Sequence, residues 1–244
     1  MSEPPVLVLG GGLLGAAIAR QLAPQQPVVV CSRTPRSHPG LWRRLDDTVE
    51  FTAGQKVFVA LGPAPAENGL ALWGELLPRL LDRLDRAAST VQICGPVGGG
   101  EPGIDRFVQA TAGRRVLRFP LLFGKEDAVI WPIIRRLREG EGVRVRRDLP
   151  TTAPLWVEDA ARAAIAGASG SLYGPDRWEA SEILDLLVLR FGGSWGTRIF
   201  ALRTAAERRA EAQVQGEDDW PEHLGERLSL ESWLDRLPGP RRSR

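Results

Sequence analysis

Residues Val6–Leu22 read VLVLGGGLLGAAIARQL, and this stretch decides the fold of the chain. Its first four residues are all apolar, as in a buried β-strand, and an alanine-rich helical segment follows directly behind a run of glycines. The turn between strand and helix, GGGLLG at residues 10–15, has the spacing G-x-G-x-x-G. Between a strand and a helix, this spacing is typical of a turn that binds the pyrophosphate of a dinucleotide.

Each glycine of this turn has its own physical role. Gly10 permits the tight turn out of the strand, Gly12 lets the backbone approach a pyrophosphate, and Gly15 lets the helix pack closely on the strand. The first N–H groups of the helix, around Leu13 and Leu14, are then available to phosphate oxygens. The alternative is that the turn is purely structural, in which case the chain is a scaffold that binds no nucleotide.

The end of the next strand bears on the choice of cofactor. Residues 27–31 complete a β-α-β unit and lead into SRTPR at residues 32–36, which contains no acidic residue. An acidic side chain at this place hydrogen-bonds the adenine ribose of NAD, whereas Arg or Ser can receive the 2′-phosphate of NADP. We therefore predict NADP(H), with NAD as the alternative, and Ser32, Arg33 and Arg36 as phosphate ligands. The competing interpretation is that these are ordinary loop residues of an arginine-rich chain.

The rest of the chain alternates between strand and helix patterns, which predicts an α/β fold: a Rossmann, doubly wound parallel sheet with ligands at the carboxyl ends of the strands. Further strands are expected in residues 48–51, 56–63, 91–94, 115–124, 155–157 and 171–175. Helices are expected at 41–45, 73–88, 104–111, 131–138, 158–165, 182–191 with Ser181 as its N-cap, 204–213 and within 220–237. The glycine- and proline-rich residues 95–103 are expected to form a mobile loop beside the cofactor crevice.

The expected organisation is a nucleotide-binding core with a small C-terminal lobe. Residues 1–125 would form the NAD(P)-binding Rossmann core, and residues 126–240 the remainder of the fold together with a substrate-side lobe. The second part would be interleaved with the core and would not fold independently. The stretch from Ala201 onward would close the substrate cleft or form a contact between the subunits of a homodimer.

Composition excludes several other classes of function. The 244 residues carry a formal net charge of +2, so neither a nucleic acid nor a membrane is indicated as a partner. No leader-like segment or long apolar span is visible, and we expect a cytoplasmic protein. Cys31 and Cys94 each end an apolar run and are expected to be buried thiols. His38 and His223 lack companions at ligand spacing, so no metal site is predicted.

Three stretches further along the chain repeat the motifs of a known family in the same order. They are VLRFPLLFG at residues 116–124, PLWVEDAARA at 154–163 and GSLYG at 170–174. With the glycine turn, they resemble the L-R-x-x-x-(V/L)-(Y/F)-G, P-x-W-V-x-D-x-A-x-A and G-x-Y-N motifs of atypical and extended short-chain dehydrogenase/reductases. The resemblance covers roughly residues 5–190. It is to the NAD-dependent epimerase/dehydratase branch that includes the dTDP-4-dehydrorhamnose reductases.

This resemblance implies a nicotinamide dinucleotide under the glycine turn and a small-molecule substrate beside it. The residues implied are Ala60, Leu61 and Gly62 on the adenine-ribose side, Ile93, Cys94 and Gly95 near the nicotinamide ribose, and Phe119 and Pro120 beside the nicotinamide. The C-terminal lobe, with Trp131 and Trp156, would close the substrate side. Both tryptophans can instead be core residues.

The catalytic pattern of the family is missing. Active members have a tyrosine and, four residues later on the same helical face, a lysine that lowers the phenol pKa for proton transfer. The only tyrosine here is Tyr173, which is followed four residues later by Arg177, and its expected role is packing. Lys125 is expected at the surface, although it could approach the cleft. The catalytic residues stay unknown, with Glu101 and Asp105 as weak candidates.

Two classes of function therefore remain open. The first is an NAD(P)-binding protein without ordinary Tyr/Lys catalysis, with a role in sensing the redox state of NADP(H). The second is an NADPH-dependent reductase or epimerase acting on a nucleotide sugar or small carbonyl compound. In that case the proton donor would be unusual: Glu101, Asp105 or a bound water.

Overall fold

The computed structural model describes most of the chain. The described residues are 3–33, 40–46, 49–61, 75–87, 89–96, 102–125, 127, 129–146, 152–198 and 218–238. The prediction of a helix at 204–213, and of site residues Arg36, Gly62 and Glu101, lies outside these ranges.

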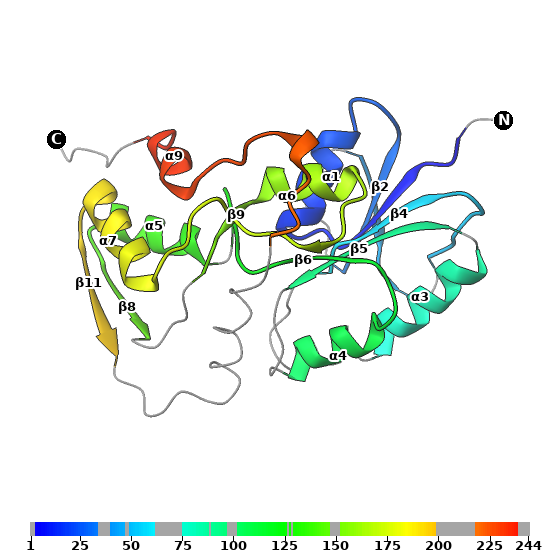
Figure 1. Cartoon of the computed structure of the whole chain (residues 1–244), viewed down its shortest axis with the longest axis horizontal. Helices are drawn as coiled ribbons and strands as arrows, with labels where there is room; N and C mark the ends of the chain where they lie inside the picture. The colour runs from blue at the N-terminus through cyan, green and yellow to red at the C-terminus, as the bar shows by residue number, and fades with distance from the viewer. Residues whose placement is uncertain are drawn as a thin grey trace.

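A parallel β-sheet forms the centre of the described structure (Figure 1). Its strand order is β10-β6-β5-β4-β1-β2-β3, so the chain starts in the middle, runs outward to β3, and then crosses back to β4 on the other side of β1. This order confirms the predicted Rossmann-type α/β fold. The strands are β1 (Val6–Leu9), β2 (Val28–Ser32), β3 (Leu41–Arg44), β4 (Lys56–Val59), β5 (Thr90–Pro96), β6 (Val116–Phe119) and β10 (Gly170–Ser171).

Helices cover both faces of the sheet. Helices α1 (Leu13–Leu22) and α6 (Val157–Ile165) lie on one face, and α3 (Leu77–Arg86) and α4 (Pro102–Ala110) on the other (Figure 1). Because both faces are covered, every residue of β1 and of β2 is buried, which explains why both strands are apolar except for Ser32 at the end of β2. The α3 layer is built on four fully buried leucines, and replacing any one by alanine would cost about 2–5 kcal/mol. They are Leu77, Leu80, Leu81 and Leu84.

Helix α6 packs closely against α1 because the residues at its buried positions have small side chains. Four of its alanines have no solvent exposure, so neighbouring backbones can approach α6 from several sides: Ala160, Ala161, Ala163 and Ala164. At the rim of this contact Glu158 accepts hydrogen bonds from Arg20 and from the side-chain amide of Gln21. The chain thus returns to the Rossmann half of the fold after residue 126.

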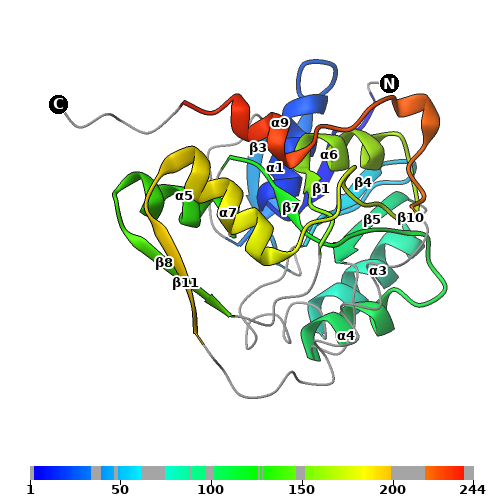
Figure 2. The same ribbon diagram turned by 60° about the vertical axis from the view of Figure 1, so that its left-hand side comes forward.

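A second hydrophobic core lies beside the sheet and forms the lobe seen in Figure 2. Its helices are α5 (Ile130–Arg138), α7 (Ala180–Phe191) and α9 (Leu230–Asp235). The rings of Phe123 and Trp233 make a T-shaped contact, with ring centroids 5.3 Å apart. Two short parallel pairs complete it: β7 (Leu122–Phe123) with β9 (Leu155–Trp156), and β8 (Gly142–Arg146) with β11 (Ser194–Arg198).

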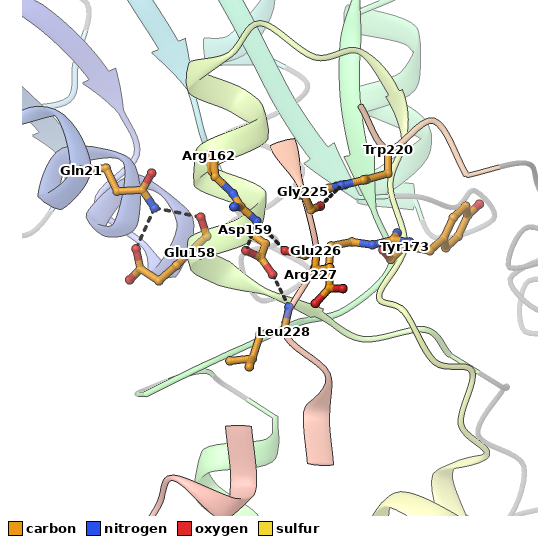
Figure 3. A network of polar contacts seen from close by, with 10 residues as sticks. All are labelled: Gln21, Glu158, Asp159, Arg162, Tyr173, Trp220, Gly225, Glu226, Arg227 and Leu228. Carbon is orange, nitrogen blue, oxygen red and sulfur yellow. Dashed lines mark hydrogen bonds and ion pairs between the residues drawn. The ribbon is translucent and has the colours of Figure 1, made fainter. Parts of the chain in front are cut away.

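Residues 218–238, called the C-terminal arm here, connect the Rossmann core to this lobe (Figure 3). The arm contains the short helix η2 (Glu222–Leu224) and then α9. Asp159 of α6 is buried and accepts a 2.7 Å hydrogen bond from the backbone N–H of Leu228. Arg227 donates to the backbone carbonyl of Tyr173 and to the Asp218 carboxylate. Beyond these contacts, α9 packs into the core of the lobe.

Several local predictions are wrong. Residues 41–44 form strand β3 instead of a short helix, because they pair in parallel with Val29–Ser32. Residues 49–51 form no strand, and β8 and β11 were not predicted. Gly95 and Pro96 continue β5 instead of opening a loop, and α4 begins at Pro102, inside the expected loop.

The N-cap of α7 is Glu179 and not Ser181. The Glu179 and Glu182 side chains bond each other's backbone N–H groups, and this reciprocal capping box satisfies two donors that a serine at position 181 could not reach. In the part of the chain that the structure describes, no helix is long and apolar enough to cross a bilayer.

Candidate functional site

The candidate site lies where the parallel strands end. The register pairs Leu9 with Cys31 and with Val59, and Pro96 with Phe119, so the carboxyl ends of five strands meet at one edge of the sheet. Backbone hydrogen bonds from Gly10 to Cys31 and from Ala60 to Leu9, each 2.8 Å long, hold this edge together. The predicted residues at it are Gly10, Gly12, Leu13, Leu14, Gly15, Ser32, Arg33, Ala60, Leu61, Cys94, Gly95, Phe119 and Pro120.

Two of the three glycines in the turn are required by protein packing. Gly10 has φ +116°, and a Cβ there would lie 2.3 Å from the carbonyl oxygen of Ala60. A Cβ on Gly15 would lie 1.8 Å from the carbonyl oxygen of Gly10, so α1 can approach β1 only without a side chain at this position. Gly12 is different, because a Cβ there would meet no heavy atom within 4 Å. Nothing in the described protein explains why position 12 lacks a side chain.

Gly12 is also the N-cap of α1. Its backbone is extended, with φ −74° and ψ −168°, and no side chain caps the helix. The first turn contains no acidic residue, so protein carboxylates do not offset the positive end of the helix dipole. The beginning of α1 therefore has the electrostatic character of an anion-binding position, with Leu14 buried beneath it and Leu13 half-buried.

The end of β2 contains a contact that the sequence did not indicate. Ser32 is only 7% exposed, and its Oγ accepts a 2.9 Å hydrogen bond from the indole N–H of Trp42 on strand β3. Arg33 follows directly and is exposed. The register places Arg44 beside Ser32 and Arg43 beside Cys31. These β3 residues were missed because 41–45 was interpreted as a helix, and nothing in the local sequence reveals their pairing with β2.

The end of β4 is closed by small or buried residues. Ala60 is 5% exposed and packs on the α1 side of the sheet, whereas Leu61 packs among residues on the α3 side. Only the backbone at these positions can line a ligand site.

Cys94, at the end of β5, belongs to the hydrophobic core. Burial raises the pKa of its thiol to about 12, so it stays protonated at neutral pH and is no nucleophile. Burial likewise raises the pKa of Cys31 to about 11, although Arg43 opposes part of this shift. Both cysteines are buried, as predicted.

Gly95 and Phe119 lie at the carboxyl ends of the neighbouring strands β5 and β6. The space beside Gly95 is filled by the fully buried ring of Phe107 from α4. Phe119 is buried at the end of β6, and Pro120 is half-buried beside it.

Among the residues that the structure describes, the titratable candidates near this edge come from different elements. Asp105 lies in the first turn of α4 and is exposed, and Lys125 is exposed just beyond β7. Tyr173 follows β10, is 5% exposed, and has its backbone held by Asp218 and Arg227 of the C-terminal arm. Figure 3 shows its ring directed away from the Asp159 network. Tyr173 is thus buried in the packing of the arm, in a different part of the chain from α4.

A buried acid near the site, Asp127, was also missed by the sequence analysis. Its carboxylate accepts hydrogen bonds from the backbone N–H groups of Gly124, Val129, Ile130 and Trp131. Burial raises its pKa more than these hydrogen bonds lower it. The role that this geometry gives Asp127 is to cap the beginning of α5.

The two tryptophans expected on the substrate side both contribute to cores. Trp131 is half-buried, with its ring centroid 6.5 Å from that of Trp233, and Trp156 packs against both the Rossmann core and the lobe. Among the described residues, no three His, Cys, Asp or Glu side chains are grouped closely enough to hold a metal ion.

The sheet order and the glycine turn define a Rossmann-type α/β protein with a small second lobe. No protein-family model matches the sequence, and no curated protein matches it. Solved structures do match. A hypothetical dTDP-4-dehydrorhamnose reductase from Sulfolobus tokodaii superposes with a TM-score of 0.66 at 13% identity, over 90% of this chain and 98% of that one.

Two further solved structures have a fold similar to that of this chain. A nucleoside-diphosphate-sugar epimerase from Staphylococcus aureus has a TM-score of 0.61 at 14% identity, over 95% of this chain and 99% of that one. The Bordetella bronchiseptica enzyme WbmG, solved in complex with NAD and UDP, has a TM-score of 0.60 at 11% identity, over 88% of this chain and 89% of that one. At these identities the likeness shows the fold, in which this chain resembles epimerase and dehydrorhamnose reductase structures over almost its full length.

Proposed function

We propose that this protein binds a nicotinamide dinucleotide at the carboxyl edge of its sheet, prefers NADP(H) to NAD(H), and does not use Tyr/Lys proton transfer. The observation that carries the proposal is the difference among the three glycines of the turn. Gly10 and Gly15 are needed for packing, but Gly12 borders open space above the uncapped beginning of α1. A turn with a purely structural role would not need a glycine at position 12, whereas a pyrophosphate approaching the backbone does.

The preference for NADP(H) is supported by charge at the end of β2. The described residues there present Ser32 and Arg33 where NAD-selective sites have an acid, and Arg43 and Arg44 lie on the neighbouring strand. A 2′-phosphate brings negative charge that these guanidinium groups can pair, whereas the ribose hydroxyls of NAD bring none. WbmG, of similar fold, was solved in complex with NAD, which supports the proposal of a nicotinamide dinucleotide; the proposed preference for NADP(H) rests on this chain's own residues.

A protein that binds the cofactor without ordinary turnover suits a role in sensing the redox state of NADP(H). The support for the sensor role is chemical. The only tyrosine of the sequence, Tyr173, is buried under the C-terminal arm, so it is not placed to form the tyrosine–lysine pair that proton transfer in active members requires. Proton transfer by such a pair contributes about 10²–10⁴ in rate. Sensing further requires that the protein distinguish NADPH from NADP⁺ in affinity.

The alternative function is an NADPH-dependent reductase or epimerase of a nucleotide sugar or small carbonyl compound. It is favoured by the position of Asp105, an exposed acid in the first turn of the helix that begins at the ligand edge. NADPH would supply the hydride, and Asp105, Glu101 or a bound water would have to supply the proton. Oxidation of NADPH in the presence of sugar nucleotides or carbonyl compounds, abolished in Asp105→Asn, would establish this alternative over the sensor.

The proposal is tested by titrating the purified protein with NADPH, NADP⁺ and NADH in a calorimeter. The expected result is binding of all three, with NADPH tighter than NADH. Failure of every dinucleotide to bind would refute the proposed function. Equal affinity for NADPH and NADP⁺ would remove the sensor role while leaving cofactor binding intact.

A variant at Gly12 separates binding from folding. Gly12→Asp places a preferred N-cap residue on α1, in space that the protein leaves open, so its melting temperature should equal or exceed that of the parent. The same carboxylate repels the pyrophosphate and should abolish binding. The matched control is Ser229→Asp, which adds the same charge at the N-cap of α9 and should leave binding unchanged.

A further inference from the structure

The two edges of the central sheet differ in how they are covered. At the β10 edge, the backbone N–H of Asp219 donates to the carbonyl of Ser171 and the Asp219 carboxylate accepts from the Ser171 N–H, so the C-terminal arm occupies this edge. Strand β3 forms the opposite edge, and no described segment pairs with its outer side. An uncovered edge strand is a template for pairing with another extended chain.

The register shows which backbone groups of β3 face this open edge. The N–H of Leu45 donates to the carbonyl of Ser32 over 3.0 Å, and in a parallel pair alternate residues bond the same neighbouring strand. Residues 41, 43 and 45 therefore direct their backbone groups to β2, whereas Trp42 and Arg44 direct theirs outward. The N–H and C=O groups of these two residues can bond a strand that lies alongside β3.

The side chains of β3 follow the same order on both faces of the sheet. Successive residues of a strand point to opposite faces, and paired residues of neighbouring parallel strands share a face. Trp42 pairs with Val30 on the α1 side, and Arg44 lies on that side too. Leu41 and Arg43 are on the α3 side. On each face an apolar side chain is therefore followed by a guanidinium group.

These side chains are exposed, and two of them carry a charge. Leu41 is 69% exposed and Trp42 39%. Arg43 and Arg44 are exposed as well, and neither guanidinium group forms a hydrogen bond or ion pair with a described residue. A second copy of the chain would bring the same positive charges to the shared edge, whereas carboxylates of another chain would pair with them. Charge complementarity thus favours an acidic strand over a second copy.

We infer that β3 binds an extended acidic segment of a partner protein, which adds to the sheet as an antiparallel strand. Antiparallel pairing is the more stable kind per residue, and directly opposite residues then share a face. From its amino end, the segment places acidic residues opposite Arg44 and Arg43, and then apolar residues opposite Trp42 and Leu41. Its order is acidic, acidic, apolar, apolar. This inference goes beyond the proposed function, because it does not depend on a dinucleotide.

The order of the peptide is tested first. Binding of two fluorescein-labelled peptides, GSEEVVSG and GSVVEESG, is measured by fluorescence anisotropy in the absence of any dinucleotide. The peptides have the same composition and charge, so a difference in affinity reports the direction of the strand. GSEEVVSG should bind at least about fivefold more tightly. Equal affinity, tighter binding of GSVVEESG, or failure of both to bind would overturn the inference.

Methylation of single peptide nitrogens tests the backbone pairing. In GSEEVVSG the first valine lies opposite Trp42, so its N–H donates to β3, whereas the second glutamate lies opposite Arg43 and its N–H points away from β3. Methylation at the first valine should weaken binding at least about tenfold, and at the second glutamate less than about twofold. Equal effects at the two nitrogens would show that the peptide does not extend the sheet, and the inference would fail.

Charge reversal tests the guanidinium groups. The double variant Arg43→Glu/Arg44→Glu should lose binding of GSEEVVSG and gain binding of GSKKVVSG, in which lysines replace the glutamates. Both replaced side chains are exposed, so the variant should fold, which circular dichroism checks. The matched control, Arg106→Glu/Arg135→Glu, has the same change of charge at exposed positions of α4 and α5 and should keep the parental preference. An unchanged preference in the β3 variant would contradict the inference.

Sedimentation of the protein alone tests the other occupant of this edge, a second copy. Trp42→Lys should leave the oligomeric state of the parent unchanged. Loss of a dimer in this variant would show that β3 pairs with a second copy, and the inferred partner would be wrong. Failure of dinucleotides to bind, with the peptide results as expected, would refute the proposed function and leave this inference intact.

Discussion

The ring of Phe107 occupies the space into which any side chain on Gly95 would extend: a Cβ on Gly95 would lie 2.1 Å from Phe107 Cζ. Phe107 is fully buried in the core between the sheet and helices α3 and α4, so its ring cannot turn out into solvent to make room. Helix α4 therefore lies directly against β5 at Gly95, and any side chain added there has to compete with Phe107 for space.

Gly95→Ser should accordingly destabilise the protein by about 1–3 kcal/mol through overpacking. Unfolding in urea, followed by circular dichroism, measures this change. Introducing Phe107→Leu together with Gly95→Ser should cost less than the sum of the two single changes, because the shorter side chain makes room for the serine. Strict additivity would show that the two positions do not compete for the same space.

Gly15→Ala should be among the most damaging single changes in the chain. Its Cβ would be placed 1.8 Å from the backbone carbonyl oxygen of Gly10, which no side-chain rotation can relieve. We expect a loss above about 3 kcal/mol, or failure to fold, measured by urea unfolding or by the yield of folded protein. Gly12→Ser, at the open position of the same turn, serves as the comparison and should retain the parental stability. Similar stability of the two variants would contradict the packing described for α1.

Asp159 makes stability depend on pH in a defined direction. Burial raises the pKa of this carboxyl above its ordinary value of 3.8, more than its hydrogen bonds to Leu228 and Arg162 lower it. The unfolded chain therefore releases this proton at lower pH than the folded chain does, so the contribution of Asp159 to stability is fully present below pH 3.8 and declines as pH rises through the folded pKa.

The measurement compares the parent with Asp159→Asn, which cannot ionise but can still accept from Leu228. The free energy of unfolding of the parent minus that of the variant should fall as pH rises through the weakly acidic range above the ordinary value. A difference that rises with pH over this range would mean that Arg162 dominates the site and that the pKa is lowered.

The two cysteines should be unreactive while the protein is folded. Both are buried, with thiol pKa values raised by burial to about 11 for Cys31 and about 12 for Cys94, so little thiolate exists at pH 8. Ellman's reagent should label neither quickly in the native protein and both in denaturant. Rapid labelling of one native thiol would show that the sheet opens locally around that cysteine at the end of β2 or β5. Mass spectrometry of the labelled peptides would identify which cysteine it is.

The parts of the fold that the sequence predicted are those governed by local rules. The VLVL strand, the spacing of Gly10, Gly12 and Gly15, and the leucines of α3 each carry their structural reason within a few residues. Strand β3 was missed because LWRR is exposed at every position, so it shows no alternation, and its strand geometry comes from pairing with residues 29–32. Strands β8 and β11 likewise depend on each other across the lobe.

In the candidate site too, features set by neighbouring residues were easier to predict than contacts between distant segments. The glycine turn is local and was found, whereas the contact between Trp42 and Ser32 depends on two strands lying side by side. Asp127 was overlooked although its signal is local: its four N–H partners, at 124 and 129–131, lie within four residues of it, and an Asp just before a helix is a preferred capping residue. The cap of α7 was placed two residues too late because Ser181 is the better N-cap residue by type, although Glu179 gains a reciprocal partner in Glu182.

The C-terminal arm also sets the order in which the molecule can be completed during synthesis. Residues Val6–Leu22 are synthesised before α9 and can begin to form the glycine turn against β2. The core of the lobe has to wait for Trp233 and Leu234 of α9, which pack against helices made some fifty to a hundred residues earlier. Until α9 is made, the apolar surfaces of α5 and α7 that it covers stay exposed, so the lobe depends on α9 to shield it from aggregation.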